Sequence, residues 1–335
     1  MPSFNRLIPE DFVVSSDTVT APLWSGNAPT LTVYYTSSIQ EAGSSGNYYL
    51  NVYQTASTDD AAEIQFAITY GNQYGSGSEL YNPLVIGNSY SRTIYGQYRN
   101  LVLGDENAGF VFGNISSSDF WALSIDRNRF KQALLPGTMT LKLSGSGGFL
   151  ELTDNSRATS TISFNEAGRI FQLVSGSAGS VYTGSNTNGY SNNNGSYGWF
   201  LPDIATIILN PLATSESIAL ASSQSYNVDG FNFRTLFNAL NAGALFTANY
   251  EETITADYIF VRARNAEFNY SENPSFISGS TGDVIYDNFI NNPQTFPTTI
   301  GLYNDNNELL AVAKLSRPLL KDFTKEALVR VKLDF

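Results

Sequence analysis

The sequence contains no cysteine and no histidine among its 335 residues. Without cysteine there is no disulfide framework, no thiolate zinc site and no iron–sulfur cluster. Without histidine the chain lacks the commonest general base, the commonest transition-metal ligand and the usual side-chain pH switch. Ser-His-Asp, Cys-His and HExxH chemistries are therefore excluded. Carboxylate, lysine or tyrosine catalysis stays open, but these absences favour a binding or structural protein.

Charge is also scarce, because charged residues make up only 14% of the chain. No uninterrupted apolar run approaches the roughly 18–20 residues of a membrane helix, so we expect no membrane insertion. The 18 basic and 30 acidic residues give a net charge of −12, which argues against broad nucleic-acid binding.

The charge is unevenly distributed, since residues 314–335 hold six basic and three acidic residues and the remainder carries −15. Two interpretations stay open for this basic segment. It is either a solvated strand face beside an acidic body, or a basic edge that docks an acidic neighbour such as another copy of the chain.

Aromatic residues, at 13%, and β-branched residues gather in short runs bounded by Gly, Asn and Ser, which is typical of strands. Such runs occupy residues 31–36, 48–53, 63–70, 120–125, 138–143, 258–264 and 328–335. Residues 120–125 are continuously apolar, as in a strand buried on both faces. Residues 299–303 and 309–313 flank an Asn-rich turn and predict a hairpin.

Three segments carry helical spacing or a capping residue. We expect helices near residues 91–102, 127–135 and 233–240, capped by Ser91, Asp126 and Asp229 respectively. The predicted fold is therefore mainly β, a β-rich α+β chain of antiparallel, sandwich-like sheets with a few short helices. The composition suggests three regions: an N-terminal β-rich domain (1–150), a Ser/Gly/Asn-rich loop region (151–200) and a C-terminal α+β domain (201–335) that ends in a strand.

Candidate chemical sites are few. The adjacent acidic pairs Asp59–Asp60, Asp105–Glu106 and Glu251–Glu252 do not show two carboxylates facing across a cleft, as a glycosidase requires. The segment from Asp305 to Glu308 is rich in oxygen ligands but fits a hairpin turn better than a calcium loop. We predict no enzyme, no catalytic residues, no cofactor and no metal.

The last eight residues alternate strictly and are the predicted interface. A terminus with so much apolar content is not expected to dangle, and strand addition at a sheet edge is the contact that it suits. The predicted interface residues are Leu328, Val329, Arg330, Val331, Lys332, Leu333, Asp334 and Phe335.

Several motifs resemble a family of virion structural proteins from contractile-tailed phages of the T-even-like group, especially those that infect marine cyanobacteria and other marine bacteria. The similarity is densest in residues 261–273, 298–304 and 308–335, and it is weakest in the first thirty residues and the Asn/Gly/Ser loop. Further similar stretches are residues 48–53, 68–71 with 74–78, 95–101, 127–131 with 135–137, and 207–211.

The resemblance implies a non-enzymatic component of the phage particle, in the tail or baseplate, that is assembled in the cytoplasm of the host bacterium. Its partners would be other virion structural proteins and copies of itself, and no nucleic acid. A capsid or neck decoration protein and a carbohydrate- or receptor-binding module that uses exposed tyrosines stay open as alternatives. No catalytic residues are carried over from the family.

Overall fold

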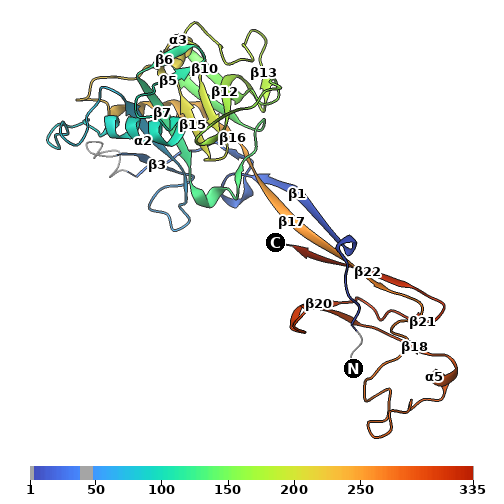
Figure 1. Cartoon of the computed structure of the whole chain (residues 1–335). Coiled ribbons are helices and arrows are strands. Elements are labelled where there is room, and N and C mark those ends of the chain that lie inside the picture. The colour runs from blue at the N-terminus through green and yellow to red at the C-terminus, as the bar shows by residue number, and fades with distance from the viewer. Residues whose placement is uncertain (1–3, 38–47, 335) are drawn as a thin grey trace. The chain divides into compact units, whose positions relative to one another are not determined.

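The computed structural model describes residues 4–37 and 48–334 and shows a mainly β protein with a few short helices, which confirms the predicted fold class (Figure 1). The chain forms two compact units. The large unit comprises Thr18–Glu252, and the small unit combines Met1–Asp17 with Thr253–Phe335. In the described residues no helix has the length and apolar character needed to cross a membrane.

The large unit is built on one extensive sheet with the strand order β2-β16-β9-β10-β12-β14-β15-β7-β4-β3, to which β11 and β13 add by pairing with β12. The strands are β2 (Thr30–Leu31), β3 (Leu50–Tyr53), β4 (Ile64–Asn72), β7 (Asp119–Ile125), β9 (Thr140–Gly145), β10 (Gly148–Asp154), β11 (Ser163–Asn165), β12 (Gly168–Ser177), β13 (Ser180–Val181), β14 (Gly198–Leu201), β15 (Thr206–Leu209) and β16 (Leu245–Thr247). A separate hairpin joins β5 (Phe110–Phe112) to β6 (Ile115–Ser117).

Strand β7 is an interior strand of this sheet, which explains its continuously apolar run of residues 120–123. It pairs with β4 on one side and with β15 on the other. Phe120, Trp121, Ala122 and Leu123 are all fully buried, so side chains on both faces of the strand are enclosed, as predicted. Such a strand needs apolar residues at every position because neither face meets water.

Helices α2 (Ser91–Leu103), α3 (Pro211–Ile218) and α4 (Phe231–Gly243) pack on this sheet, with α2 against β4 and α4 against β9 and β4. The predicted helices near residues 91–102 and 233–240 are therefore confirmed. The predicted helix at 127–135 is wrong. Only a 3₁₀ turn, η3 (Arg127–Arg129), follows Asp126, and β8 (Ala133–Leu134) then pairs with β17. The pairing of β8 with β17 thus overrides the local preference for a helix after Asp126.

The small unit contains three small sheets. Strands β1 (Phe12–Pro22), β17 (Asn249–Ala263) and β22 (Ala327–Asp334) follow one another in the first, and the chain passes between the units within β1 and within β17. The others pair β18 (Gln294–Thr295) with β21 (Lys321–Asp322) and β19 (Thr299–Tyr303) with β20 (Leu309–Lys314), the predicted hairpin. Short helices complete the described elements: η1 (Pro9–Asp11), α5 (Asn288–Asn291) and, in the large unit, η2 (Ser25–Asn27).

The compact units have other boundaries than the regions at 1–150, 151–200 and 201–335 that the composition suggests. Both chain ends contribute to the small unit, and composition along a chain carries no signal for a unit assembled from distant segments. Residues 151–200 lie within the large unit and include strands β11 to β13 beside their turns.

Candidate functional site

The predicted interface lies in β22, whose residues Ala327–Asp334 pair with β17 without interruption. The register runs from Ala263↔Ala327 to Ala256↔Asp334, so eight consecutive residue pairs form with no bulge. Phe335 lies outside the described residues. The strict sequence alternation thus forms a regular strand at the edge of a sheet, which is the geometry that strand addition requires.

The two faces of β22 differ in character. Val331 is buried, and Val329 and Leu333 are half-buried on the same side, where Val331 and Leu333 contribute to the apolar cluster of the small unit. Leu328, Arg330, Lys332 and Asp334 alternate with them and are exposed. This alternation of apolar and charged side chains is typical of a strand with one face toward a core and one toward solvent or a partner.

Aromatic and charged groups line the exposed face of β22. The guanidinium of Arg330 lies 5.2 Å from the ring centroid of Tyr258 on β17, and the ammonium of Lys332 lies 6.0 Å from the same ring. Lys332 also forms a 2.8 Å ion pair with Asp334. The hydrogen bond to Asp334 raises the pKa of Lys332, and the nearby carboxylate of Asp17 adds to this effect.

The outer edge of β22 carries unpaired backbone groups. In the sheet order β1-β17-β22, β22 is the last strand, and no strand of the described chain other than β17 pairs with it. An edge of this kind presents a row of free N–H and C=O groups to a partner strand, and proteins usually protect such edges with proline, bulges or charge. Between Ala327 and Asp334 there is no proline and no bulge, so Arg330 and Lys332 are the features that limit indiscriminate pairing.

The small unit has little core of its own. Its buried apolar cluster has three members, Ile259, Leu302 and Val331. Beside them lies a cavity of about 860 Å³, lined by Phe4, Leu7 and Phe12 from the N-terminal segment and by residues of β17, β19 and β22. This cavity is open to solvent, so the apolar side chains that line it form an accessible groove beside the small buried cluster.

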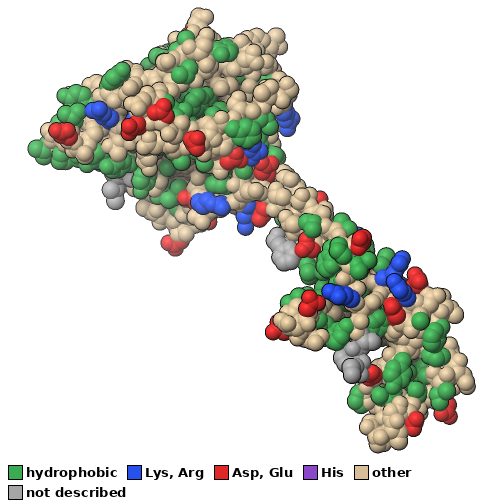
Figure 2. All heavy atoms as spheres, in the orientation of Figure 1, with side chains coloured by type: hydrophobic (Ala, Val, Ile, Leu, Met, Phe, Trp, Pro, Cys, Tyr) green, Lys and Arg blue, Asp and Glu red, His purple; other side chains and the backbone are tan. Residues whose placement is uncertain are grey.

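Apolar side chains are instead exposed over much of the small unit, and Figure 2 shows them (green) at its surface, with Lys, Arg, Asp and Glu among them. Leu328 on β22 is 63% exposed and Leu310 on β20 is 68% exposed. The other large examples are Phe4, Ile8, Phe12, Val13, Val14, Tyr270, Ile285, Tyr286, Ile290, Phe296, Tyr303, Leu309, Val312 and Phe323. Contiguous exposed apolar patches are typical of interaction surfaces.

Lys321 is a buried charge in the small unit that the sequence did not single out. The residue is 1% exposed. Its ammonium donates to the backbone oxygen of Asn265 (3.1 Å), the Asn269 Oδ1 (2.8 Å) and the backbone oxygen of Asp322 (3.0 Å). All three ammonium protons therefore have acceptors, which offsets the cost of burying the charge. Lys321 ties the 265–269 turn to β21 and lines the cavity.

The large unit holds buried carboxylates that sequence reasoning also missed. Asp119, fully buried, accepts hydrogen bonds from Tyr70 (2.8 Å), Ser222 (2.5 Å) and Gln224 (3.0 Å). Asp119 is the first residue of the apolar strand β7, and this position in the sequence could have indicated that its carboxylate is buried. Because neutral donors saturate this carboxylate, it links β4 and β7 to the 222–224 segment rather than facing a substrate.

Asp229 was predicted to cap a helix, and its side chain has a different role. Helix α4 begins at Phe231 with Gly230 as N-cap and no side-chain cap bond. The Asp229 carboxylate accepts from the Ser89 N–H (3.1 Å), the Ser89 hydroxyl (3.0 Å) and the Ser91 hydroxyl. Burial raises the pKa of Asp229 above its usual range. The predicted cap Ser91 is thus engaged by Asp229, and Tyr90 is the N-cap of α2.

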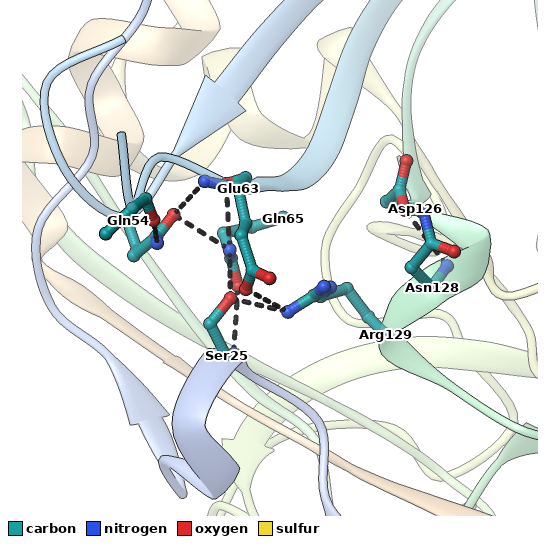
Figure 3. A network of polar contacts seen from close by, with 8 residues as sticks. Ser25, Gln54, Glu63, Gln65, Asp126, Asn128 and Arg129 are labelled. Carbon is teal, nitrogen blue, oxygen red and sulfur yellow. Dashed lines mark hydrogen bonds and ion pairs between the residues drawn. The ribbon is translucent and has the colours of Figure 1, made fainter. Parts of the chain in front are cut away.

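A polar network around Arg129 joins the η3 turn to β4 and η2 (Figure 3). Arg129 forms a 2.8 Å ion pair with Glu63 and donates to Ser25 Oγ (2.5 Å), and Gln65 donates to the same hydroxyl (2.6 Å). Hydrogen bonds from Ser25 and Arg129 lower the pKa of Glu63. The side chains of Glu63 and Gln65 both have hydrogen-bond or ion-pair partners in this network. The network therefore holds the η2 and η3 turns against the start of β4.

The acidic pairs from the sequence do not assemble into a site. Asp59–Asp60 and Asp105–Glu106 are exposed in turns, where Asp59 accepts from Ala61 N–H and Asp105 from Asn107 N–H. Glu251 instead forms a 2.8 Å ion pair with Arg169. Within residues 4–37 and 48–334 no group of three or more acidic side chains is placed to hold a metal ion.

Comparison with known proteins gives no further guide, since no family model, no curated protein and no solved structure matches this chain.

Proposed function

We propose that this chain is a non-enzymatic structural subunit of a contractile-tailed phage particle, placed in the tail or baseplate, that acts through protein–protein contacts in a symmetric assembly. The observation that carries the proposal is the small unit. It combines the open edge of β22, a three-member buried apolar cluster and many exposed apolar side chains. A surface of this kind is stabilised when a partner covers it.

The placement in a phage particle is supported by the resemblance of residues 261–273, 298–304 and 308–335 to virion structural proteins. Those residues lie in the small unit. The resemblance is therefore densest in the unit that has the smaller buried apolar cluster. An assembly subunit needs a stably folded part and a surface that its neighbours cover. In this proposal the large unit is the stably folded part and the small unit supplies the surface.

The first test is quantitative mass spectrometry of purified phage particles from the strain that encodes the chain. We expect tens of copies per particle, as suits a tail or baseplate. Hundreds of copies would favour the capsid decoration alternative, and absence of the chain from particles would overturn the proposal.

The second test uses two matched leucine substitutions. Leu328 on β22 and Leu84 in the large unit are both exposed, at 63% and 89%, so replacing either with aspartate spares the interior packing. We expect Leu328→Asp to reduce incorporation into particles at least about tenfold, because it places a charge in a buried contact, and Leu84→Asp to leave it unchanged. Equal incorporation of both variants would remove β22 from the interface.

A carbohydrate-binding role has one observation in its favour. Tyr48 stacks on Tyr90 at a centroid distance of 4.5 Å and Tyr81 lies 4.1 Å from Tyr90, while Tyr74 is 70% exposed. Aromatic side chains that stay accessible can stack on sugar rings. A glycan array with the full chain tests this candidate, and specific binding lost in Tyr74→Ala would favour it over assembly alone.

A further inference from the structure

Within the described residues no further strand pairs with the outer side of β1 or of β22, and these two edges of the sheet differ in charge. Residues 7–17, which include the small-unit part of β1, contain Glu10, Asp11 and Asp17 and no basic residue. β22 presents Arg330 and Lys332 on its exposed face, beside Asp334. Asp17 lies on β1 itself, and Glu10 and Asp11 lie in the η1 turn directly before it. The β1 side of the sheet is therefore acidic and the β22 side is predominantly basic.

The charges on the two outer strands are linked through the central strand. Arg330 and Lys332 both contact the ring of Tyr258 on β17, and the carboxylate of Asp17 on β1 contributes to raising the pKa of Lys332. The row of strands thus runs from acid on β1 through an aromatic on β17 to base on β22. If a second sheet continues this row, base on one copy meets acid on the next, and directly opposed side chains on neighbouring strands lie about 4.5–5.5 Å apart.

We propose that the occupant of the β22 edge is a second copy of this chain, which adds its acidic β1 edge beside β22 and so continues the sheet from copy to copy. This inference rests on the proposed assembly function and names its partner. A contact between two different edges is heterologous, so repetition closes a ring when the rotation between copies permits and forms a filament when it does not.

Apolar groups support the same pairing. Phe12, Val13 and Val14 on β1 are exposed, and so is Leu328 on β22. Symmetric pairing of β22 with β22 would bring basic residues near basic residues, and pairing of β1 with β1 would do the same for acidic ones. Like charges on opposing strands are destabilising, so the unlike edges are the favoured partners.

The test measures self-association of the full chain by sedimentation velocity at several concentrations and salt levels. Two charge-reversal variants address the two edges: Arg330→Glu with Lys332→Glu on β22, and Glu10→Lys with Asp17→Lys on β1. Asp11 is left intact because its carboxylate caps the backbone N–H of Ile8. We expect each variant alone to weaken association at least about tenfold, and the wild-type association to weaken as salt rises.

Mixing the two variants is the decisive arm. In the mixture the reversed β22 of one chain meets the reversed β1 of the other, and the remaining edges keep their original pairing. We expect the mixture to recover association to within about threefold of wild type. Recovery also shows that neither variant has lost its fold. A β1 variant that associates as wild type, or a mixture that stays dissociated, would overturn the heterologous pairing.

A matched control is available in the same basic segment. Lys314 and Arg317 are exposed and lie outside β22, so Lys314→Glu with Arg317→Glu changes the net charge by the same amount as the β22 variant. We expect its association to match wild type within about twofold. An equal effect of this control would mean that net charge, and not the β22 edge, governs association.

The self-pairing and the assembly function fail in different ways. If the wild-type chain stays monomeric at concentrations up to about 100 μM, well above typical specific interface affinities, yet is found in particles and loses incorporation on Leu328→Asp, the β22 partner is another virion protein. That outcome overturns the self-pairing and leaves the assembly function intact. A monomer that is absent from particles overturns both.

Discussion

The large and the small unit reach a folded state by different means. The large unit encloses a continuous apolar cluster that extends from Leu23 to Ala248 and includes fully buried Phe66 and Trp121. The small unit has three buried apolar residues in its cluster, a solvent-open cavity of about 860 Å³ and open strand edges within its described residues. From this difference we expect the large unit to be stable on its own, and we expect the small unit to gain part of its stability from the neighbours proposed above.

The contrast has an energetic basis. Each fully buried large apolar side chain contributes about 1.5–3 kcal/mol, and that contribution must exceed the conformational entropy lost on ordering. An isolated two-stranded sheet is only marginally stable in water, and two of the three sheets in the small unit have two strands. A unit with so few enclosed side chains gains stability when a partner strand supplies backbone hydrogen bonds and covers exposed side chains such as Leu328.

The strongest challenge to the large unit is a deletion in its aromatic centre. Phe66 is fully buried and its ring lies near Trp24, Tyr34 and Phe246. We expect Phe66→Ala to lower the free energy of unfolding by about 3–5 kcal/mol, because the substitution loses the favourable free energy of burying the ring and leaves a cavity. Urea denaturation measures this, and a loss below about 1 kcal/mol would contradict a tightly packed core there.

A slightly smaller effect is expected from the buried carboxylate Asp119. Asp119→Ala removes the carboxylate that accepts from Tyr70, Ser222 and Gln224. Tyr70 and Gln224 keep longer hydrogen bonds to the backbone oxygen of Ser223 and to Ser118 Oγ, and we expect a loss of about 2–3 kcal/mol. The exposed Asp105 serves as the control, where alanine is expected to cost less than about 0.5 kcal/mol. Similar losses at both sites, by the same denaturation experiment, would refute a structural role for the Asp119 network.

The two units are compared most directly by the same substitution in each. Val52 is fully buried in the large unit, and Val331 is buried in the small unit. We expect Val52→Ala to cost about 2–3 kcal/mol and Val331→Ala about 1 kcal/mol in dilute chain, because a loosely packed site relaxes around the deletion. Amide exchange in β4 and in β17 reports each unit separately. Equal costs would mean that the small unit is packed as tightly as the large one.

The smallest effect concerns pH and Asp229. Burial raises its pKa in the folded chain, so its neutral form is favoured by folding. The associated stability is present at low pH and is lost as the pH rises through the raised pKa. We therefore expect Asp229→Asn to gain stability relative to wild type between pH 4 and pH 7, by less than the Val52 effect. A difference that is constant over this range would show that Asp229 keeps its usual pKa.

Sequence reasoning succeeds where one local pattern decides the outcome. Strict alternation predicts β22, the continuous apolar run predicts β7, and the Asn-rich turn predicts the β19–β20 hairpin. For β7 the pattern also predicts burial of both faces. The predicted interface role of residues 328–335 stays a prediction, although the position of β22 at a sheet edge is compatible with it.

Sequence reasoning fails where distant residues compete with local preference. Asp229 is well placed to cap a helix, yet Ser89 and Ser91, far away in sequence, capture its carboxylate. Asp126 is well placed to cap a helix over residues 127–135, yet Leu134 pairs with Tyr250. The small unit is built from both chain ends, and Lys321 finds its acceptors only after folding. None of these contacts leaves a local signature in the sequence.

The dependence of the small unit on neighbours is tested most directly by amide hydrogen exchange of the full chain over a dilution series. We predict that exchange in β22 and in the small-unit part of β1 accelerates at least about tenfold as the chain is diluted, because backbone groups at those edges lose their partners. Exchange in β7 and β15 should stay constant and slow. Concentration-independent protection of β22, equal to that of β7, would contradict the account.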